Sequence, residues 1–252
     1  MRSAPRALIA GLGLIGGSIG MALRARGWGV AFDDPHVTLD EARRAGAADE
    51  VGGDADIDLI VIATPVDAAI EILRAASREP RTTSVCGVML PLREVADERR
   101  LTFVAGHPMA GSHERGLSAA SGDLFRNKKW FVDGDEPLVA RLIDDCGATM
   151  ERVDPGEHDA AVALTSHLPQ LLSTALAAYI GQQDVIDFAG SGLQTFLRLA
   201  ASDASVWAPL IDANRANIVR HLEGVLRVAR EILDGDSDGF TRAQELLRLL
   251  TR

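Results

Sequence analysis

RALIAGLGLIGGSIGMALRARGWGVAFDD, residues 6–34, holds two apolar runs separated by a glycine-rich turn and a helical pattern. Residues 7–10 predict a short buried strand, residues 14–26 a helix that Gly27 ends, and residues 28–32 a second strand. A strand, a tight turn, a helix and a second strand in this order are typical of a βαβ unit. The stretch therefore predicts a parallel sheet covered by helices.

The turn has the G-x-G-x-x-G spacing of dinucleotide-binding proteins. Its first glycine permits a tight turn, the second lets the backbone approach a pyrophosphate, and the third allows the helix to pack closely on the strand. The positive end of the following helix stabilises the diphosphate. The expected cofactor-binding residues of this turn are Gly11, Gly13, Leu14, Ile15 and Gly16.

An acidic residue follows the second predicted strand. Asp33 lies 22 residues after Gly11, where a carboxylate accepts hydrogen bonds from the ribose hydroxyls of NAD. Asp34 adds a second negative charge, which would repel the extra phosphate of NADP, so the expected cofactor is NAD. Thr64 and Pro65 are also expected near the cofactor, although a proline that begins a helix explains them equally well.

Strand and helix patterns alternate as far as residue 154. Further strands are expected at residues 58–63, 82–88 and 101–105, and helices at 38–46, with a capping box, and at 66–77. Residues 130–132 and 148–153 are expected to add edge strands around a helix at 136–146. Beyond Pro155 only helical patterns follow, at residues 157–180, 193–201, 205–233 and 238–250. These patterns predict a Rossmann-like doubly wound parallel sheet in residues 1–154 and an all-α domain in residues 155–252.

Composition narrows the class of protein further. The chain has 252 residues, 47% of them apolar, and a net charge of −10, which argues against binding to nucleic acid or to a membrane surface. Cys86 and Cys146 form no CxxC pair and fit a reducing cytoplasmic compartment. The apolar faces of the C-terminal helices favour a homodimer through the helical domain.

A histidine motif, GHPMAGS, occupies residues 106–112, directly after the last predicted strand of the sheet. Ligands of such sheets bind beyond the carboxyl ends of the strands, so His107 is expected at the mouth of the cofactor site. Its imidazole titrates near neutral pH and can accept a hydroxyl proton while a hydride leaves the same carbon. The alternative is a loop histidine held only by the backbone.

The chain resembles the prephenate/arogenate dehydrogenase family of tyrosine biosynthesis. The resemblance implies an NAD-dependent oxidative decarboxylation that converts prephenate to 4-hydroxyphenylpyruvate and needs no metal. It rests on four segments in family order: GLGLIGG at 11–17, GHPMAGS at 106–112 with Leu124-Phe125, EHDAAVALTSHLPQ at 157–170, and GLQTFLRLAASDASVW at 192–207 with Asn214.

The resemblance also implies roles for single residues. His107 matches the family's catalytic histidine, which accepts the hydroxyl proton. Arg198 matches the arginine that binds a substrate carboxylate, a task that suits its planar fork. Pro169 is expected to kink its helix, and His158-Asp159 is expected to have a structural or interdomain role. The predicted substrate-binding residues are Arg198, His167, Gln170, Ser112 and Trp207.

Departures from the family pattern keep alternatives open. The family's D-x-x-S-x-K segment aligns with Ser84, Gly87 and Met89, so its serine and lysine are absent. This motivates a second hypothesis, an NAD-binding sensor or partner protein with impaired catalysis. Arogenate dehydrogenase is the rival enzyme, although His113, where relatives often have glutamate, favours prephenate. A two-domain dehydrogenase for 3-hydroxyacids or imines would not need the histidine motifs.

A metal site is a further alternative for the histidines of the chain. Four histidines, at positions 107, 113, 158 and 167, could converge in the fold. The chain has no HExxH motif and no Cys–His ligand spacing. No metal is therefore expected.

Overall fold

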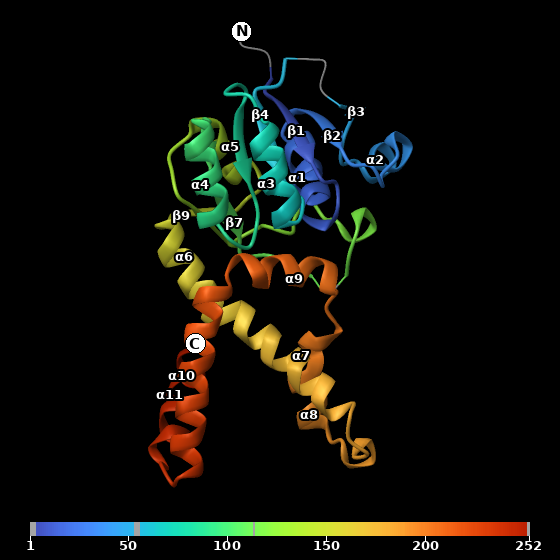
Figure 1. The fold of residues 1–252 in the computed structure, drawn as a ribbon. Helices are drawn as coiled ribbons and strands as arrows, with labels where there is room; N and C mark the ends of the chain where they lie inside the picture. The colour runs from blue at the N-terminus through green and yellow to red at the C-terminus, as the bar shows by residue number, and fades with distance from the viewer. Residues whose placement is uncertain (1–3, 53–55, 113, 251–252) are drawn as a thin grey trace. The chain divides into compact units, whose positions relative to one another are not determined.

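The computed structural model describes residues 4–52, 56–112 and 114–250 (Figure 1). Among these residues, no helix has both the length and the apolar character needed to cross a bilayer.

The main sheet has six strands in the order β3-β2-β1-β4-β5-β6, and all of its neighbouring strands are parallel. This is the strand order of a Rossmann-type doubly wound sheet. The α/β class with helices following the sheet is thereby confirmed. The strands are β1 (Arg6–Ala10), β2 (Gly29–Asp33), β3 (Glu50–Val51), β4 (Leu59–Ile62), β5 (Arg81–Ser84) and β6 (Phe103–Val104).

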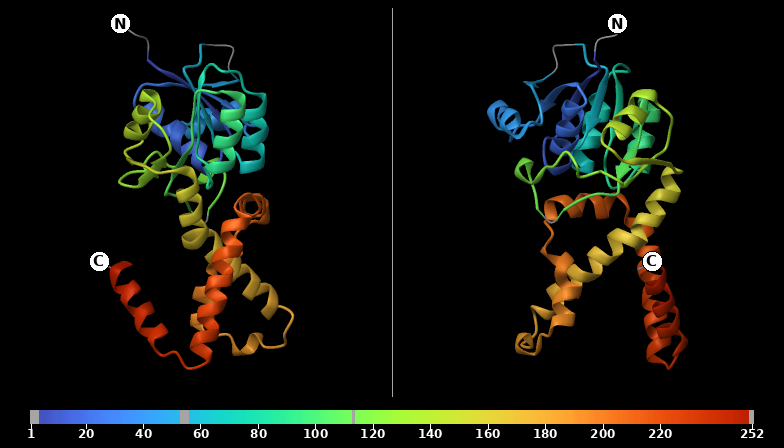
Figure 2. Two further views of the ribbon diagram at one scale, coloured as in Figure 1. Left: turned by 60° about the vertical axis from the view of Figure 1, so that its left-hand side comes forward. Right: turned by 180° about the vertical axis from the view of Figure 1, so that it is seen from behind.

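Helices pack on this sheet through two apolar clusters. One cluster joins β1 and β2 to α1, α2 and α5, and the other joins β4 and β6 to α3 and α4, which lie side by side in Figures 1 and 2. The predicted start and end of α2 are confirmed: Thr38 and Glu41 form a capping box, and Gly46 ends the helix with φ +73°. The bounds are α1 (Leu14–Ala25), α2 (Leu39–Ala45), α3 (Val66–Ala75), α4 (Leu90–Arg99) and α5 (Pro137–Asp145).

A second sheet of three strands, in the order β7-β8-β9, carries the histidine motif. Its strands are β7 (Gly106–Pro108), β8 (Lys129–Val132) and β9 (Thr149–Arg152). The expectation that residues 130–132 and 148–153 extend the edge of the main sheet is therefore wrong. The physical reason is pairing: Gly106 in β7 pairs with Val132 in the antiparallel sense, and β8 binds β7 and β9 on its two edges.

The long helices predicted after residue 154 are interrupted. The first consists of α6 (Pro155–Val162), a π-helical segment η2 (Ala163–His167) and α7 (Leu168–Ile180). Pro169 lies in the first turn of α7, directly after the π-helical segment. The predicted helix at 205–233 breaks at Asn214 into α9 (Ala204–Ala213) and α10 (Arg215–Leu233). The other helical segments are η1 (Leu117–Ala119), η3 (Ile186–Phe188), α8 (Ser191–Leu197), η4 (Arg198–Ala201) and α11 (Asp238–Leu250).

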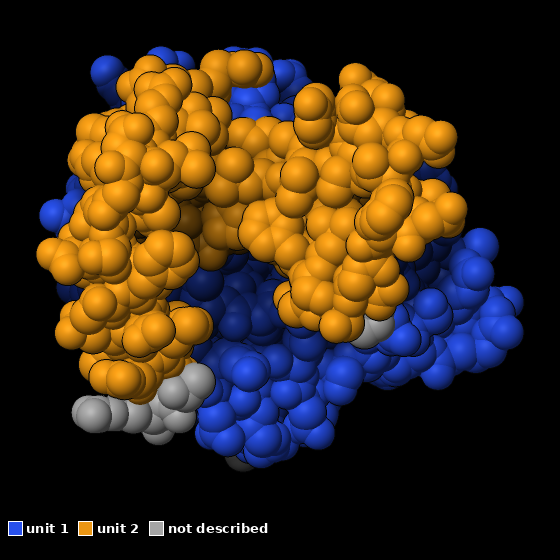
Figure 3. Space-filling model, turned by 90° about the horizontal axis from the view of Figure 1, so that it is seen from below, with its two compact units in different colours: residues 1–159, 202–213 blue, residues 160–201, 214–252 orange. Residues whose placement is uncertain are grey.

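The chain divides into two compact units, coloured separately in Figure 3. The first unit contains residues 1–159 and 202–213, and the second contains residues 160–201 and 214–252. Helix α9 thus belongs to the first unit, where Leu210 packs against the cluster that holds Val88 and Met89. The sequence did not predict this return of the chain, and the domain boundary near residue 154 stays a prediction.

Candidate functional site

The three glycines of the loop between β1 and α1 have three different environments. Gly11 has φ +90°, and an added Cβ would lie 2.8 Å from the carbonyl oxygen of Ala63. A Cβ on Gly16 would lie only 1.9 Å from the carbonyl oxygen of Gly11, whereas a Cβ on Gly13 would have no atom within 4 Å. The loop is therefore closed at its first and third glycines and open at Gly13, which fits the close approach of a diphosphate.

The start of α1 also suits an anion. Gly13 is the N-cap residue and supplies no side-chain hydrogen bond, and the first turn contains no acidic residue. The amide groups of the first turn are unpaired within the helix, and the helix dipole is positive at this end. Leu14 and Ile15 occupy this turn and are partly buried.

Asp33 ends β2 and Asp34 follows it, and the two carboxylates have different surroundings. Asp33 is exposed, as a residue that binds a ribose would be. Asp34 accepts a hydrogen bond from the Leu12 amide at 2.7 Å and one from the His36 amide at 2.8 Å. Asp34 therefore fastens the loop after β2 to the glycine loop, a contact that the sequence did not predict.

Thr64 and Pro65 follow β4, and Pro65 is the N-cap of α3. The Thr64 hydroxyl is buried and has no hydrogen-bond partner among the described residues. The Thr64 carbonyl accepts a weak hydrogen bond from the Cys86 thiol at 3.6 Å. Burial raises the pKa of that thiol to about 12, so Cys86 is not a nucleophile at neutral pH.

His107 lies in β7, opposite Phe131 of β8, and is partly buried. Its Nδ1 lies 2.9 Å from Nε2 of His158. The two rings meet edge to face, with centroids 5.1 Å apart. The sequence placed His107 in a loop at the edge of the main sheet, whereas the structure places it on a strand of the second sheet.

His107 contacts a buried His–Asp pair of α6. His158 and Asp159 are 3% and 2% exposed, and His158 Nδ1 lies 2.8 Å from Asp159 Oδ1. The same carboxylate accepts hydrogen bonds from the amides of Met89, at 2.8 Å, and Leu90, at 3.0 Å, where α4 begins. Asp159 thus caps α4 and holds His158, and His158 in turn contacts His107.

Residues 84–89, which are expected to align with the family's D-x-x-S-x-K segment, run from the end of β5 to the start of α4. The Ser84 hydroxyl is buried and has no partner among the described residues. A Cβ on Gly87 would lie 2.6 Å from Cδ1 of Leu210 in α9, so α9 fills the space that a longer side chain would need. The Met89 amide donates its hydrogen bond to Asp159.

The second unit holds Arg198, His167 and Gln170. Gln170 Nε2 donates to the Leu199 carbonyl at 2.8 Å and to the Thr174 hydroxyl at 3.1 Å. Gln170 is therefore engaged in holding η4, the short turn that begins with Arg198, against α7. Arg198 itself is exposed. His167 is buried, with Nδ1 3.1 Å from Nδ2 of Asn214.

Ser112 and Trp207 belong to the first unit. Ser112 is exposed, and its hydroxyl accepts a hydrogen bond from the Glu114 amide at 3.1 Å. Trp207 lies on α9 and is partly buried. His113, which bears on the choice of substrate, lies outside the described residues.

Potential metal ligands do not gather in the described part of the chain: no group of three or more His, Cys, Asp or Glu side chains there could hold a metal ion. Of the four histidines that could have converged, His107 and His158 are in contact. His167 belongs to the other unit.

Comparisons with known proteins agree with this description. The sequence model of "Prephenate dehydrogenase, nucleotide-binding domain" matches residues 19–149, and that of "Prephenate dehydrogenase, dimerization domain" matches residues 154–246. The chain is 32% identical to the probable prephenate dehydrogenase NovF of Streptomyces niveus, over 98% of this chain and 75% of that protein.

Solved structures share the fold. Prephenate dehydrogenase from A. aeolicus, in complex with hydroxyphenyl propionate and NAD+, has a TM-score of 0.86 and 24% identity, covering 99% of this chain and 98% of that one. Synechocystis arogenate dehydrogenase has a TM-score of 0.76 and 24% identity, covering 98% and 96% of the two chains. The same fold therefore occurs in proteins named for either substrate.

A Rossmann-type sheet with an open glycine loop, followed by a helical region, defines a dinucleotide-binding protein. The two family models and the relative that is 32% identical identify the family. The chain belongs to the prephenate dehydrogenase family, an oxidoreductase family of tyrosine biosynthesis.

Proposed function

We propose that this protein is an NAD-dependent prephenate dehydrogenase. The observation that carries the proposal is the contact of His107 with a buried His–Asp pair, in the same unit as an open glycine loop. The relative of known structure that is described with NAD+ bound supports the choice of cofactor. His113, at a position where relatives often have glutamate, favours prephenate over arogenate.

The proposed chemistry assigns one proton to His107. NAD, when bound, accepts a hydride from the ring carbon that bears the hydroxyl. His107 accepts the hydroxyl proton at the same time, as a general base. When the ring carboxylate leaves as carbon dioxide, the electron pair of the broken C–C bond makes the ring aromatic, and the resulting phenolate oxygen takes the proton back from His107. Atoms and charges balance without a metal.

Other residues bind the reactants in this proposal. Asp33 accepts hydrogen bonds from the adenosine ribose, and the amides at the start of α1 hold the diphosphate. Arg198 binds a substrate carboxylate through its planar fork. Ser112, His167, Gln170 and Trp207 complete the substrate-binding residues.

The test is NADH formation by the purified protein with NAD and either prephenate or arogenate. Turnover of prephenate is the expected result, and NADP in place of NAD should support little of it. His107→Asn should lower kcat by about 100-fold or more and leave the affinity for NAD nearly unchanged. Turnover of arogenate alone would exchange the substrate, and NAD binding without turnover of either would favour a sensor or partner protein.

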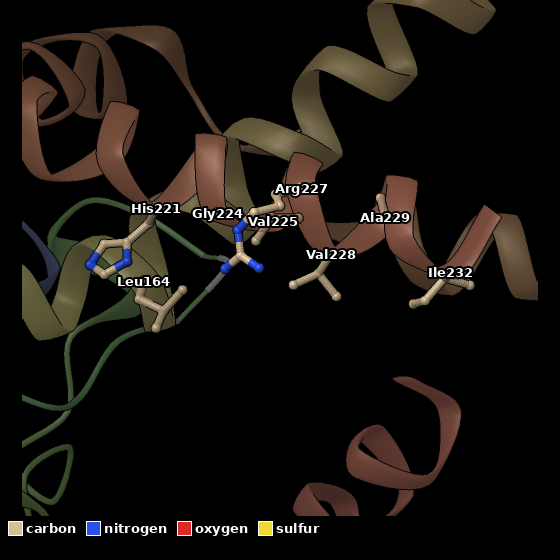
Figure 4. Close-up of a pocket in the computed structure, with 8 residues that line it drawn as sticks. All are labelled: Leu164, His221, Gly224, Val225, Arg227, Val228, Ala229 and Ile232. Atoms are coloured by element: carbon tan, nitrogen blue, oxygen red, sulfur yellow. The ribbon is translucent and has the colours of Figure 1, made fainter. Parts of the chain in front are cut away.

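We also propose that the protein is a homodimer through its helical unit. A groove of about 400 Å³ runs along α10, and Figure 4 shows the side chains that line it, with Leu164 beside His221. From their connecting turn α10 and α11 diverge in the left view of Figure 2, and apolar side chains there are exposed: Leu233, Phe240, Leu246, Leu247, Leu249 and Leu250. Such a surface suits a partner, and the family model of this region is a dimerization domain.

Sedimentation of the purified protein tests the homodimer. The expected mass is twice that of the 26.8 kDa chain. Val228→Glu, which introduces a charge into the groove, should yield monomers that keep their helical content. A wild-type protein that sediments as a monomer at micromolar concentration would contradict the proposal.

A further inference from the structure

The contacts of Asp159 fix which of its groups donate and which accept. Backbone N–H groups only donate, and those of Met89 and Leu90 each point to one oxygen of this carboxylate, at 2.8 and 3.0 Å. Both oxygens are therefore acceptors, which favours the carboxylate form of Asp159. His158 Nδ1, at 2.8 Å from Asp159 Oδ1, must then carry a proton.

The protonation of His158 determines which ring nitrogen of His107 carries a proton. A neutral imidazole has one donor nitrogen and one acceptor nitrogen. Since Nδ1 of His158 donates to Asp159, its Nε2 accepts. The group that faces this Nε2 at 2.9 Å is Nδ1 of His107, which must therefore carry a proton. The proton on Nδ1 leaves the lone pair of His107 on Nε2.

Packing holds His158 in the orientation that this chain of bonds needs. His158 is 3% exposed, and its ring contacts both members of a cross-strand pair, His107 and Phe131. The centroid distances are 5.1 Å to His107 and 5.9 Å to Phe131. A ring enclosed by two neighbours and bonded at both nitrogens has one orientation, so the chain of bonds is built into the fold.

We propose that His158 and Asp159 are positioning residues for His107: they hold it in the tautomer whose Nε2 accepts a proton, and they stabilise the positive charge that His107 gains. The proposal rests on the proposed function of His107 as a general base. The ionised Asp159 supplies the negative charge, and the intervening His158 ring transmits it by hydrogen bonding. This assigns a specific role to a pair for which the sequence suggested only a structural or interdomain one.

Two substitutions at residue 158 separate positioning from packing. The amide of asparagine reaches about as far as Nδ1 of histidine, so His158→Asn keeps a donor for Asp159 and removes the contact with His107. The longer glutamine reaches the position of Nε2, so His158→Gln keeps an acceptor for His107. We expect His158→Asn to lower kcat by about 10- to 100-fold with a much smaller change in KM. His158→Gln keeps the acceptor but lacks the contact with Asp159, so it should lose clearly less turnover than His158→Asn.

A control addresses loss of stability. Trp28→Phe removes a partly buried hydrogen bond of the same unit, from the Trp28 indole to Asp145 at 2.8 Å, and should lower the melting temperature without changing kcat. Equal turnover by His158→Asn and wild type would overturn the proposal. So would equal losses in His158→Asn and His158→Gln.

A measurement without substrate keeps the proposal separate from the enzyme assay. Long-range ¹H–¹⁵N spectra of histidine side chains distinguish protonated from unprotonated ring nitrogens, and His107→Asn identifies the signals of His107. The expected spectrum of the wild type has a proton on Nδ1 and none on Nε2, and Asp159→Asn should disturb this pattern. If Nε2 carries the proton in the wild type, the proposal is wrong, whether or not the protein turns over prephenate. If neither substrate reacts while the spectrum is as expected, the proposed function fails and the tautomer assignment stands.

Discussion

Replacing Gly13 and Gly16 one at a time by alanine separates cofactor binding from folding. A Cβ at residue 13 meets no atom within 4 Å, and φ is −78° there, which alanine adopts without strain. The loss of unfolded-state freedom stabilises the variant by about 0.4–1 kcal/mol, whereas alanine is a poorer N-cap residue than glycine. The two effects offset one another, so the free energy of unfolding of Gly13→Ala should stay within about 1 kcal/mol of the wild type.

The affinity of Gly13→Ala for NAD should fall nonetheless. The methyl group occupies the open space where the diphosphate approaches the backbone. Crowding by an extra methyl in a close contact costs about 1–3 kcal/mol, which corresponds to a roughly 5- to 150-fold weaker NAD complex.

Gly16→Ala should show the opposite pattern. Its Cβ would lie 1.9 Å from the Gly11 carbonyl oxygen, more than 1 Å inside van der Waals contact. Neither atom can move without its backbone, because the oxygen belongs to the main chain and the Cβ is bonded directly to Cα. The helix must move away from the loop, so we expect a loss of about 1–3 kcal/mol or more in the free energy of unfolding.

Urea unfolding followed by circular dichroism measures the stability of both variants, and calorimetric titration measures their affinity for NAD. Gly13→Ala with the NAD affinity of the wild type would refute the placement of the diphosphate over Gly13. Gly16→Ala with the stability of the wild type would refute the close approach of α1 to the loop.

Three further predictions concern other parts of the molecule. Arg198→Ala should raise the KM for prephenate by tenfold or more, because the substrate carboxylate loses a charged partner worth about 1.5–3 kcal/mol. The control is Arg230→Ala, at an exposed arginine of α10. Equal KM values for the two variants would remove Arg198 from the site. Thr64→Val should leave the free energy of unfolding unchanged or slightly higher, because the buried hydroxyl has no partner among the described residues, and a weaker NAD complex in this variant would show that the hydroxyl serves the cofactor. Burial raises the pKa of Cys86 and Cys146 to about 12, whereas an unfolded thiol titrates near 8.5–9. The folded protein therefore keeps protons that the unfolded chain releases above about pH 9. The free energy of unfolding should fall by up to about 1.4 kcal/mol per pH unit per thiol between pH 9 and 12. Urea unfolding at pH 8 to 11 tests this, and a Cys86→Ala, Cys146→Ala variant that loses stability as steeply would contradict it.

Local signals in the sequence were sufficient where one short segment determines the conformation. The glycine turn predicted β1 and α1, and Thr38, Glu41 and Gly46 predicted both ends of α2. These features depend on contacts within a few residues, so a short stretch of sequence is enough to predict them.

Pairing between distant segments could not be predicted in the same way. Strand β7 has only three residues, and its partner in β8 lies more than twenty residues further along the chain, so neither periodicity nor composition shows that His107 leaves the main sheet. Helix α4 was missed because its apolar positions are few. The contact of His158 with His107 spans 51 residues, and the His158-Asp159 motif alone gave no sign of its partner.

The break at Asn214 was missed for a related reason. Residues 205–233 have continuous helical periodicity, and only the packing of Leu210 on the first unit shows that the chain ends one helix and begins another. Tertiary contacts override a local pattern at this position.

The return of α9 to the first unit affects synthesis on the ribosome. The last residue of the unit's main segment is Asp159, and α9 ends at Ala213, about 50 residues later. At translation rates of about 5–20 residues per second, this interval lasts roughly 3–10 s. During that time the nascent chain presents the apolar surface around Val88 and Met89 without Leu210 to cover it. The first unit therefore cannot complete its fold until about half of the helical unit has been made, and a fragment that ends at residue 159 would present this surface permanently.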